Sequence, residues 1–431
     1  RGSSSYIPCD EINSIMCDRS GMMWIGSIGG GVLMADTHKS LFTSHRLNFD
    51  NDEIPTTSVR ALFTDSENNI WMGIGSYGLA RLDNKTENLM LYKQMPEFVG
   101  ISVPTIFSVI QRKVSGEIWF GTYDGGIFTY KKGQKTRNLT PENSKFITSS
   151  CISALYEDRQ GNCWVGTRGG LGIQLKNGDS FVFPKISFTD GASLDWFYVR
   201  DILSDKDNSI WLATSNFGLI HITGDLNKPA TLKYTNYSFY NRKLLTNNVL
   251  CLHIDHANRF WAGTEGGGLY LYDSQKDVFI GKNQDYNIPG DMVGSILEDK
   301  KQNLWLGTNM GLVKLNTNGF GNGSFVRTYT EADGLQGNFL ISRSACSRNG
   351  EFFFGGNRGY DSFYPEKMID RQQDVPFAIT DIKIFNRSIT SFPLKKWYEL
   401  TQMTPTFTDK ITLPHQYNNF SIEFAALTYK N

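Results

Sequence analysis

A set of variable turns carries the side chains in this sequence that are best suited to hold a ligand. Their rings can stack on the C–H faces of sugars, and their amide, carboxylate and guanidinium groups can pair with hydroxyls, carboxylates or sulfates. The candidate ligand-binding residues are Tyr77, Tyr123, Asp124, Arg168, Trp196, Tyr198, Asn216, Phe217, Glu265, Asn309 and Arg358. This set predicts an oligosaccharide-binding site, with solvated turns or an interface patch as the alternative.

The same turns offer little for catalysis. A propeller glycosidase needs two carboxylates that flank the scissile bond, and the candidates Asp124 and Glu265 stand three repeats apart. The six histidines form no HExxH pattern, and the six cysteines show no CxxC or zinc spacing. The glycines at 29–31 and 266–268 precede no helix, so they predict turns and not phosphate cradles. We expect no catalytic residue, metal or cofactor, and we keep a propeller glycosidase or lyase as an alternative.

These turns are positioned by a repeat of 44 to 50 residues. Each copy reads polar turn, aromatic, apolar, glycine or another small residue, small polar, turn, glycine. The aromatic anchors are Trp24, Trp71, Trp119, Trp164, Trp211, Trp261, Trp305 and Phe353. A period in the forties that is built from short strands is typical of a β-propeller blade. One large ring in every copy indicates a buried wedge between blades, which we prefer to a row of sugar platforms.

Within a copy, alternation predicts strands that are joined by tight hairpins. Residues 293–299 alternate with period two, 304–308 carry the aromatic anchor, and 311–315 follow as a third strand. An aspartate such as Asp158, three residues before Gly161, can accept backbone N–H groups and close the first hairpin. The predicted fold class is therefore all-β. In a four-stranded blade, the candidate binding turns would ring one mouth of the central channel.

The number of blades depends on how the ring closes. The last copy has three evident strands, and residues 41–47 can supply a fourth, which removes an exposed edge. A seven-bladed propeller over residues 41–368 then leaves residues 1–40 as a residual blade of a preceding propeller. A single eight-bladed ring is the alternative. Alternating strands at 377–385 and 420–427 predict the beginning of an immunoglobulin-like sandwich in residues 375–431.

The charge and apolar composition limit the classes of partner that we expect. Lys+Arg and Asp+Glu are both 43, and no basic stripe stands out, so we expect no contact with nucleic acid. The chain has no apolar run of about 18 residues, and we expect no membrane span within it. It begins without Met and without an apolar signal core, so a signal peptide is expected upstream or already removed.

The repeats resemble the two-component regulator propeller repeat, most clearly over residues 152–158, 161–167 and 169–171. Residues 333–339, 354–359 and 363–365 resemble the last blade before a triple-tyrosine (Y_Y_Y) domain. Residues 375–377 through 420–429 resemble the first half of that domain. The resemblance covers essentially the whole chain, and eight copies in register make it specific.

The resemblance implies the periplasmic sensor region of a hybrid two-component histidine kinase, as part of an inner-membrane-anchored protein. Members of that family sense oligosaccharides and pass the signal through the Y_Y_Y domain to a cytoplasmic kinase. The implied partners are an oligosaccharide ligand, a second copy in a homodimer, and the first propeller and membrane-linked kinase of the same parent chain. Most of the first propeller and every catalytic module are missing here, so kinase activity is implied only for the parent. A non-catalytic interaction or dimerisation propeller is the alternative.

Overall fold

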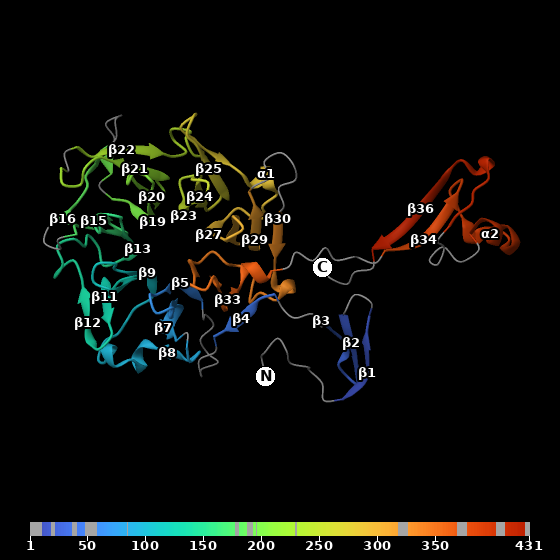
Figure 1. The fold of residues 1–431 in the computed structure, drawn as a ribbon, viewed down its shortest axis with the longest axis horizontal. Coiled ribbons are helices and arrows are strands. Elements are labelled where there is room, and N and C mark those ends of the chain that lie inside the picture. Colours follow the sequence, from blue (N-terminus) through green and yellow to red (C-terminus); the bar gives the residue numbers. More distant parts are fainter. Residues whose placement is uncertain are drawn as a thin grey trace. The chain divides into compact units, whose positions relative to one another are not determined.

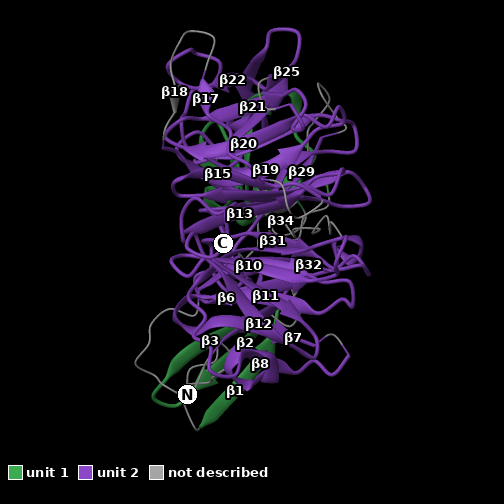
Figure 2. Ribbon diagram, turned by 90° about the vertical axis from the view of Figure 1, so that its left-hand side faces the viewer, with its two compact units in different colours: residues 1–40, 369–431 green, residues 41–368 purple. Residues whose placement is uncertain are grey.

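A computed structural model describes most of the chain. The described residues are 11–18, 22–36, 41–47, 58–83, 85–176, 181–187, 193–194, 196–228, 231–317, 326–368, 377–401 and 410–426. They divide into two compact units, coloured differently in Figure 2: residues 41–368 form one, and residues 1–40 with 369–431 form the other. No described helix is both long enough and apolar enough to cross a bilayer.

Residues 41–368 form a β-propeller, in which seven four-stranded antiparallel sheets are described around a central axis (Figure 1). The first, innermost strands of the blades are β5 (Val59–Thr64), β9 (Ile106–Gln111), β13 (Ile152–Glu157), β19 (Tyr198–Ser204), β23 (Val249–Ile254), β27 (Val293–Glu298) and β31 (Ser344–Cys346). The second strands are β6 (Ile70–Ile74), β10 (Ile118–Thr122), β14 (Cys163–Thr167), β20 (Ile210–Ser215), β24 (Phe260–Thr264), β28 (Asn303–Thr308) and β32 (Phe352–Gly356).

The outer half of each blade completes the sheet. The third strands are β7 (Gly78–Leu82), β11 (Ile127–Lys131), β15 (Gly170–Gln174), β21 (Leu219–Thr223), β25 (Leu269–Asp273), β29 (Gly311–Asn316) and β33 (Gly359–Phe363). The outermost strands are β8 (Leu89–Leu91), β12 (Gln134–Leu139), β16 (Phe181–Val182), β22 (Lys233–Tyr237), β26 (Val278–Gly281), β30 (Val326–Tyr329) and β4 (Thr43–Arg46). The connections contain β17 (Ile186–Ser187), β18 (Ser193–Leu194), α1 (Asn283–Tyr286), η1 (Gly75–Tyr77), η2 (Tyr92–Gln94), η3 (Pro96–Phe98), η5 (Glu331–Asp333) and η6 (Pro365–Lys367).

The last blade is completed by a strand from the beginning of the unit. β4 pairs antiparallel with β33, so that Ser44 lies opposite Asp361 and His45 opposite Tyr360. In Figure 1 the blue β4 lies beside the orange β33 for this reason. The His45 ring stacks on the Tyr360 ring with centroids 4.4 Å apart. This is the pairing that the sequence suggests for residues 41–47, and it covers the outer edge of β33.

The repeated aromatic residue is the wedge between neighbouring blades. Trp71, Trp164, Trp261 and Trp305 are all but fully buried. Trp71 packs against Phe120 and Tyr130 of the next blade, with ring centroids 5.1 and 4.8 Å apart. The burial of these rings confirms the interpretation as core.

The turn aspartates accept hydrogen bonds from these rings as well as from the backbone of the turns. The Asp158 carboxylate accepts from the backbone N–H groups of Gln160 and Asn162, the Asn162 amide, and the indole N–H of Trp164, each at 2.9 Å. The backbone bonds are those expected from the sequence, but the bond to the indole was not anticipated. It recurs in the pairs Asp18–Trp24, Asp65–Trp71, Asp205–Trp211, Asp255–Trp261 and Asp299–Trp305.

We expect Asp158→Ala to lower the free energy of unfolding by about 2 kcal/mol, because it leaves buried donors without an acceptor. The half-buried turn aspartate Asp83 accepts from the backbone of Lys85 and Thr86, and no indole among the described residues donates to it. Asp83→Ala is therefore the matched control and should cost less than half as much. Urea unfolding followed by circular dichroism measures both, and equal effects would contradict a role for the buried indole bond.

Close approach of neighbouring blades requires a small residue two positions after the aromatic anchor. A Cβ placed on Gly73 would lie 2.7 Å from the carbonyl oxygen of Ile106, on the first strand of the next blade. A Cβ on Gly355 would lie 2.5 Å from the carbonyl oxygen of Val59. These glycines allow the second strand of one blade to approach the first strand of the next.

The second unit contains two separate antiparallel sheets. β1 (Ile12–Cys17), β2 (Met22–Ser27) and β3 (Gly31–Asp36) form one, and β34 (Phe377–Ile384), β35 (Arg387–Ser388) and β36 (Phe420–Ala426) form the other. Between the strands of the second sheet lie η7 (Ile389–Ser391), α2 (Leu394–Thr401) and η9 (His415–Tyr417). Ile382, Ile384, Ile389 and Leu400 form its buried cluster. The strands agree with the sequence expectation, but helix α2 was not anticipated.

Candidate functional site

One end of the propeller gathers most of the residues that the sequence suggests for binding. Because the strands of each blade run antiparallel, the turns between second and third strands lie at the same end as the connections that lead into first strands. We call this end the mouth face. Ten of the eleven candidate residues lie in these turns and connections, and Tyr198 begins a first strand.

Seven candidates on the mouth face are exposed, and Asn216 and Arg358 are two of them. The side chains of Tyr123 and Trp196 are 48% and 55% exposed. Asp124, Arg168 and Glu265 are exposed as well. The Tyr123 ring meets the ring of Phe107 edge to face at 5.7 Å. These side chains are free to meet a ligand at the rim.

Some candidates contribute to the scaffold. Tyr77 and Phe217 are half-buried and pack against blade cores. Asn216 takes a left-handed conformation with φ of 76°, and its backbone N–H donates to Asn248. The Asn309 side chain donates to Asp291 at 2.9 Å and accepts from the backbone of Met292. Arg358 forms an exposed ion pair with Glu331 at 2.7 Å.

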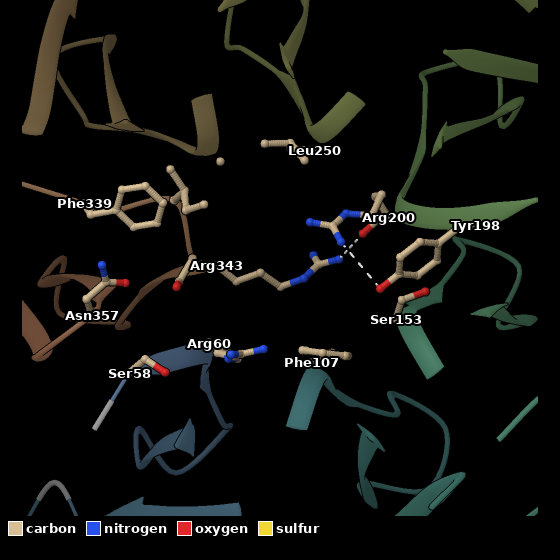
Figure 3. Close-up of a pocket in the computed structure, with 13 residues that line it drawn as sticks. Ser58, Arg60, Phe107, Ser153, Tyr198, Arg200, Leu250, Phe339, Arg343 and Asn357 are labelled. Carbon is tan, nitrogen blue, oxygen red and sulfur yellow. Dashed lines mark hydrogen bonds between the residues drawn. The ribbon is translucent and has the colours of Figure 1, made fainter. Parts of the chain in front are cut away.

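A cavity of about 320 Å³ lies on the channel axis, and Tyr198 is the one candidate among its lining residues. Figure 3 shows side chains from blades on all sides pointing into it. We call it the channel cavity. Besides Tyr198, the cavity is lined by one residue from each of six first strands: Arg60, Phe107, Ser153, Arg200, Leu250 and Gly294.

These six residues share one backbone feature. In β5, Val59 pairs with Ile74 and Ala61 pairs with Gly73, which leaves Arg60 as the extra residue of a β-bulge. The register shifts at the equivalent position in β9, β13, β19, β23 and β27. A bulge leaves one residue outside the ladder and re-aims its side chain. The strict alternation expected along 293–299 is therefore wrong at Gly294.

The sequence contains a signal for this site that the pattern of the turns does not reveal. The bulge residue follows an invariant Val or Ile in these six copies and is followed by a small or short residue. Between these constant neighbours it varies among arginine, phenylalanine, serine, leucine and glycine. Variation within a constant frame marks recognition positions as clearly in a strand as in a turn.

Three arginines meet in the channel cavity, and one of them has a carboxylate partner (Figure 3). Arg343 Nη1 lies 3.0 Å from Asp201 Oδ1, and its Nη2 donates to the carbonyl oxygen of Arg200 at 2.6 Å. The Arg60 and Arg200 guanidinium groups form no ion pair with any described residue. Arg60 lies 5.8 Å from the centroid of the Phe107 ring, and Arg200 lies 5.3 Å from that of Tyr198.

The thiols near the channel are kept neutral. Burial raises the pKa of Cys251, which donates to the carbonyl oxygen of Val293 at 3.6 Å. Burial also raises the pKa of Cys151, against the opposing charge of Arg168. Among the described residues, no group of three or more His, Cys, Asp or Glu side chains is placed to hold a metal ion. The cavity therefore presents donors and rings, which are suited to binding.

Comparisons with known proteins agree with this architecture. Residues 147–169 and 287–310 match the family model described as the two component regulator propeller. The whole chain is similar to part of the histidine kinase P4 of Formosa agariphila, with 25% identity over 438 residues that cover 100% of this chain and 31% of that protein. The chain thus spans about a third of the length of this relative.

Two solved structures from B. thetaiotaomicron share the fold. The extracellular domain of the hybrid two component system BT3049 matches with a TM-score of 0.69 and 21% identity, covering 99% of this chain and 54% of that one. The extracellular domain of the hybrid two component system BT4673 matches with a TM-score of 0.59 and 19% identity, covering 97% of this chain and 54% of that one. The resemblance of the repeats to the two-component regulator propeller repeat is confirmed over the matched residues, and so is the propeller fold.

Proposed function

We propose that this chain is the ligand-sensing, extracytoplasmic part of a two-component sensor histidine kinase, and that its propeller binds an oligosaccharide through the mouth face. The observation that carries the proposal is the channel cavity, which is lined by the bulge residues of six blades. A constant scaffold that aims variable side chains at one enclosed space is the usual construction of a recognition site.

The exposed rings of the mouth face support a sugar as the ligand. Tyr123 and Trp196 offer flat apolar surfaces, and Phe107 links Tyr123 to the cavity. A sugar ring can stack on such surfaces while its hydroxyls pair with polar groups such as Ser58 and Asn357 in the lining. Among the described residues, the lining contains no carboxylate, imidazole or thiol, and the role we propose for this piece is binding without turnover.

The similarity to a much longer histidine kinase supports the rest of the proposal. Kinase activity, anchoring in the inner membrane, a periplasmic location for this part and assembly as a homodimer are proposed for the parent protein. We assign residues 1–40 to a blade of a preceding propeller. The sheet of β1–β3 contains the Asp18–Trp24 bond, which is the same aspartate–indole bond that recurs in the blades of residues 41–368. We assign residues 375–431 to a Y_Y_Y domain that transmits the signal. A ligand can transmit only if it favours one arrangement of these parts over another.

An interaction surface is the second candidate function, because exposed apolar side chains occur in mouth-face turns and in the connections that lead into first strands. In the described part of residues 41–368, the exposed large apolar residues in mouth-face turns and connections are Val99, Tyr123, Phe183, Trp196, Phe239, Tyr240, Leu245, Met310 and Phe339. Of the exposed large apolar residues described in this unit, Val114 alone lies in a turn at the opposite end. Apolar patches of this kind also mark protein interfaces.

A calorimetric screen of the whole chain with defined neutral and acidic oligosaccharides tests the proposal. We expect saturable binding without product release, and a rise in melting temperature with ligand. Leu250→Trp fills the channel cavity and should weaken binding by about tenfold or more. Leu245→Trp, at an exposed position of the same face, is the control.

The other possible results of this screen each favour a different function. Release of a product would favour an enzyme. Binding that Leu250→Trp leaves unchanged would remove the channel cavity from the proposal. Self-association through the mouth face, measured by sedimentation and without binding of any glycan, would favour the interaction surface.

A further inference from the structure

We infer that the channel cavity recognises an oxyanion, a carboxylate or sulfate carried by the sugar, between the guanidinium groups of Arg60 and Arg200. The inference deepens the proposed function and rests on it for the sugar that carries the charge. It specifies the chemical class of the ligand and the two residues that select it.

The backbone places these two arginines for this task. Each is the bulge residue of its first strand, so its side chain leaves the ladder and enters the cavity. Each guanidinium lies near a ring of the lining, Phe107 for Arg60 and Tyr198 for Arg200. A ring beside a guanidinium limits its rotation and leaves its N–H edge free to donate. The Tyr198 hydroxyl lies 3.5 Å from Arg200 Nη1, a loose contact that a ligand can replace.

Arg343 has a different role, which explains why three arginines are present. Its backbone N–H donates to the carbonyl oxygen of Arg60 at 3.4 Å, and its guanidinium donates to the carbonyl oxygen of Arg200. The Asp201 carboxylate neutralises it and also accepts from the backbone N–H of Leu252. Arg343 therefore ties the backbones of both bulges together and is a positioning residue.

The charge balance of the cavity favours an anion. Three cationic side chains line it, and Asp201, bound to Arg343, is the one carboxylate found in an ion pair with them among the described residues. Two positive charges are left in a concave space whose walls are partly apolar, which concentrates the field on the axis. A guanidinium binds a carboxylate or sulfate through two parallel hydrogen bonds, and two guanidinium groups can hold one oxyanion from two sides.

The test uses the whole chain and matched probes. We compare melting temperatures in sodium sulfate, in sodium acetate and in sodium chloride of equal ionic strength. Titration calorimetry then compares glucose, glucuronate and glucose 6-sulfate, which differ at one carbon. We expect sulfate or acetate to stabilise the chain beyond chloride, and glucuronate or glucose 6-sulfate to bind at least about tenfold more tightly than glucose.

The variants assign the effect to residues. Arg60→Gln and Arg200→Gln should each weaken binding of the anionic probes by about tenfold, and the double variant should abolish it. The double variant Arg60→Lys with Arg200→Lys keeps both positive charges but loses the paired N–H groups of the guanidinium, and it should bind the anionic probes with intermediate affinity. This variant also tests the inference if the glutamine variants fold poorly. Arg348→Gln, at an exposed turn on the opposite end of the propeller, removes the same charge and should change nothing.

The two proposals fail in different ways. A sulfate response that is equal in the wild type and the double glutamine variant overturns the anion inference. A neutral oligosaccharide that binds both proteins equally, and that Leu250→Trp excludes, would leave the proposed function standing without the anion. Arginine-dependent binding of sulfate with no response to any sugar would keep the anion site and remove the sugar.

Discussion

Glu157→Ala is expected to lower the free energy of unfolding of the propeller by about 3–5 kcal/mol, because it leaves a buried guanidinium without its carboxylate. Glu157 Oε2 lies 3.1 Å from Arg112 Nε of the preceding blade, and the two side chains are only 5% and 9% exposed. The same oxygen accepts from the backbone N–H of Lys113 at 2.8 Å. Urea unfolding, followed by the fluorescence of the buried tryptophans, measures the loss.

Two further variants separate burial from charge. Glu366→Ala removes a carboxylate from the exposed pair with Lys300, at 3.1 Å, and should cost less than about 1 kcal/mol. The double variant Arg112→Met with Glu157→Leu removes both charges and should recover most of the loss, because no unpaired charge stays buried. A loss at Glu157→Ala no greater than that at Glu366→Ala would show that this ion pair does not hold the blades together.

The stability of the propeller is expected to fall as the pH rises from about 4 to 7, through Asp361 in the blade that closes the ring. Burial raises the pKa of this carboxyl from 3.8 to about 7, although the bonds from Ser44 and Gln336 and the nearby Arg46 act in the opposite direction. Its Oδ2 is buried and has no partner among the described residues.

The direction of this pH dependence follows from the protonation of Asp361 in the folded and unfolded chain. Between these two pKa values the unfolded chain has released the proton and the folded chain retains it, so deprotonation favours unfolding. Across this window the loss amounts to about 4 kcal/mol for one carboxyl. The Ser44 hydroxyl lies 2.5 Å from both the Gly334 carbonyl and Asp361 Oδ1. The Ser44 hydroxyl has one proton, which can be donated to only one of these two oxygens. It can be donated to the Gly334 carbonyl if Asp361 is protonated and its carboxyl group donates to the Ser44 oxygen.

Asp361→Asn should remove this dependence, so that the variant gains stability relative to the wild type as the pH rises from 4 to 8. Thermal unfolding at a series of pH values measures the difference. The control is Asp273→Asn, which makes the same chemical change at the half-buried last residue of β25. Backbone hydrogen bonds from Lys276 and Gln275 lower the pKa of Asp273, so its effect falls below pH 4 and outside the window. Parallel pH profiles for the wild type and Asp361→Asn would contradict the prediction.

Much of the fold could be predicted from the sequence because the determinants are local and repeated. The spacing of Trp71, Trp164 and Trp261 reflects a physical period, since every blade needs one large ring at the same depth. The strand at 41–47 could be predicted because the last copy lacks a fourth strand and an open edge is costly. Helix α2 was missed because it is a short element between strands, without a repeat to reveal it.

The site was predicted less well, for a physical reason. The mouth-face turns could be recognised as variable loops, and Tyr123 and Trp196 do lie exposed there. Arg60 and Arg200 were missed because a period of two assigns a strand residue to one face of a sheet, whereas a bulge aims it along the channel. The bond from Arg343 to Asp201 joins residues 142 positions apart, and no local pattern predicts it.

The strand exchange in the last blade also dictates when this protein can finish folding. Ser44 and Asp361 are 317 positions apart. At typical synthesis rates, a ribosome needs roughly 15–60 s to make the intervening chain. During that time β4 has no partner, while the earlier blades can already assemble from neighbouring segments. The nascent propeller is thus expected to emerge as an open arc whose leading strand stays unpaired until β33 has been made.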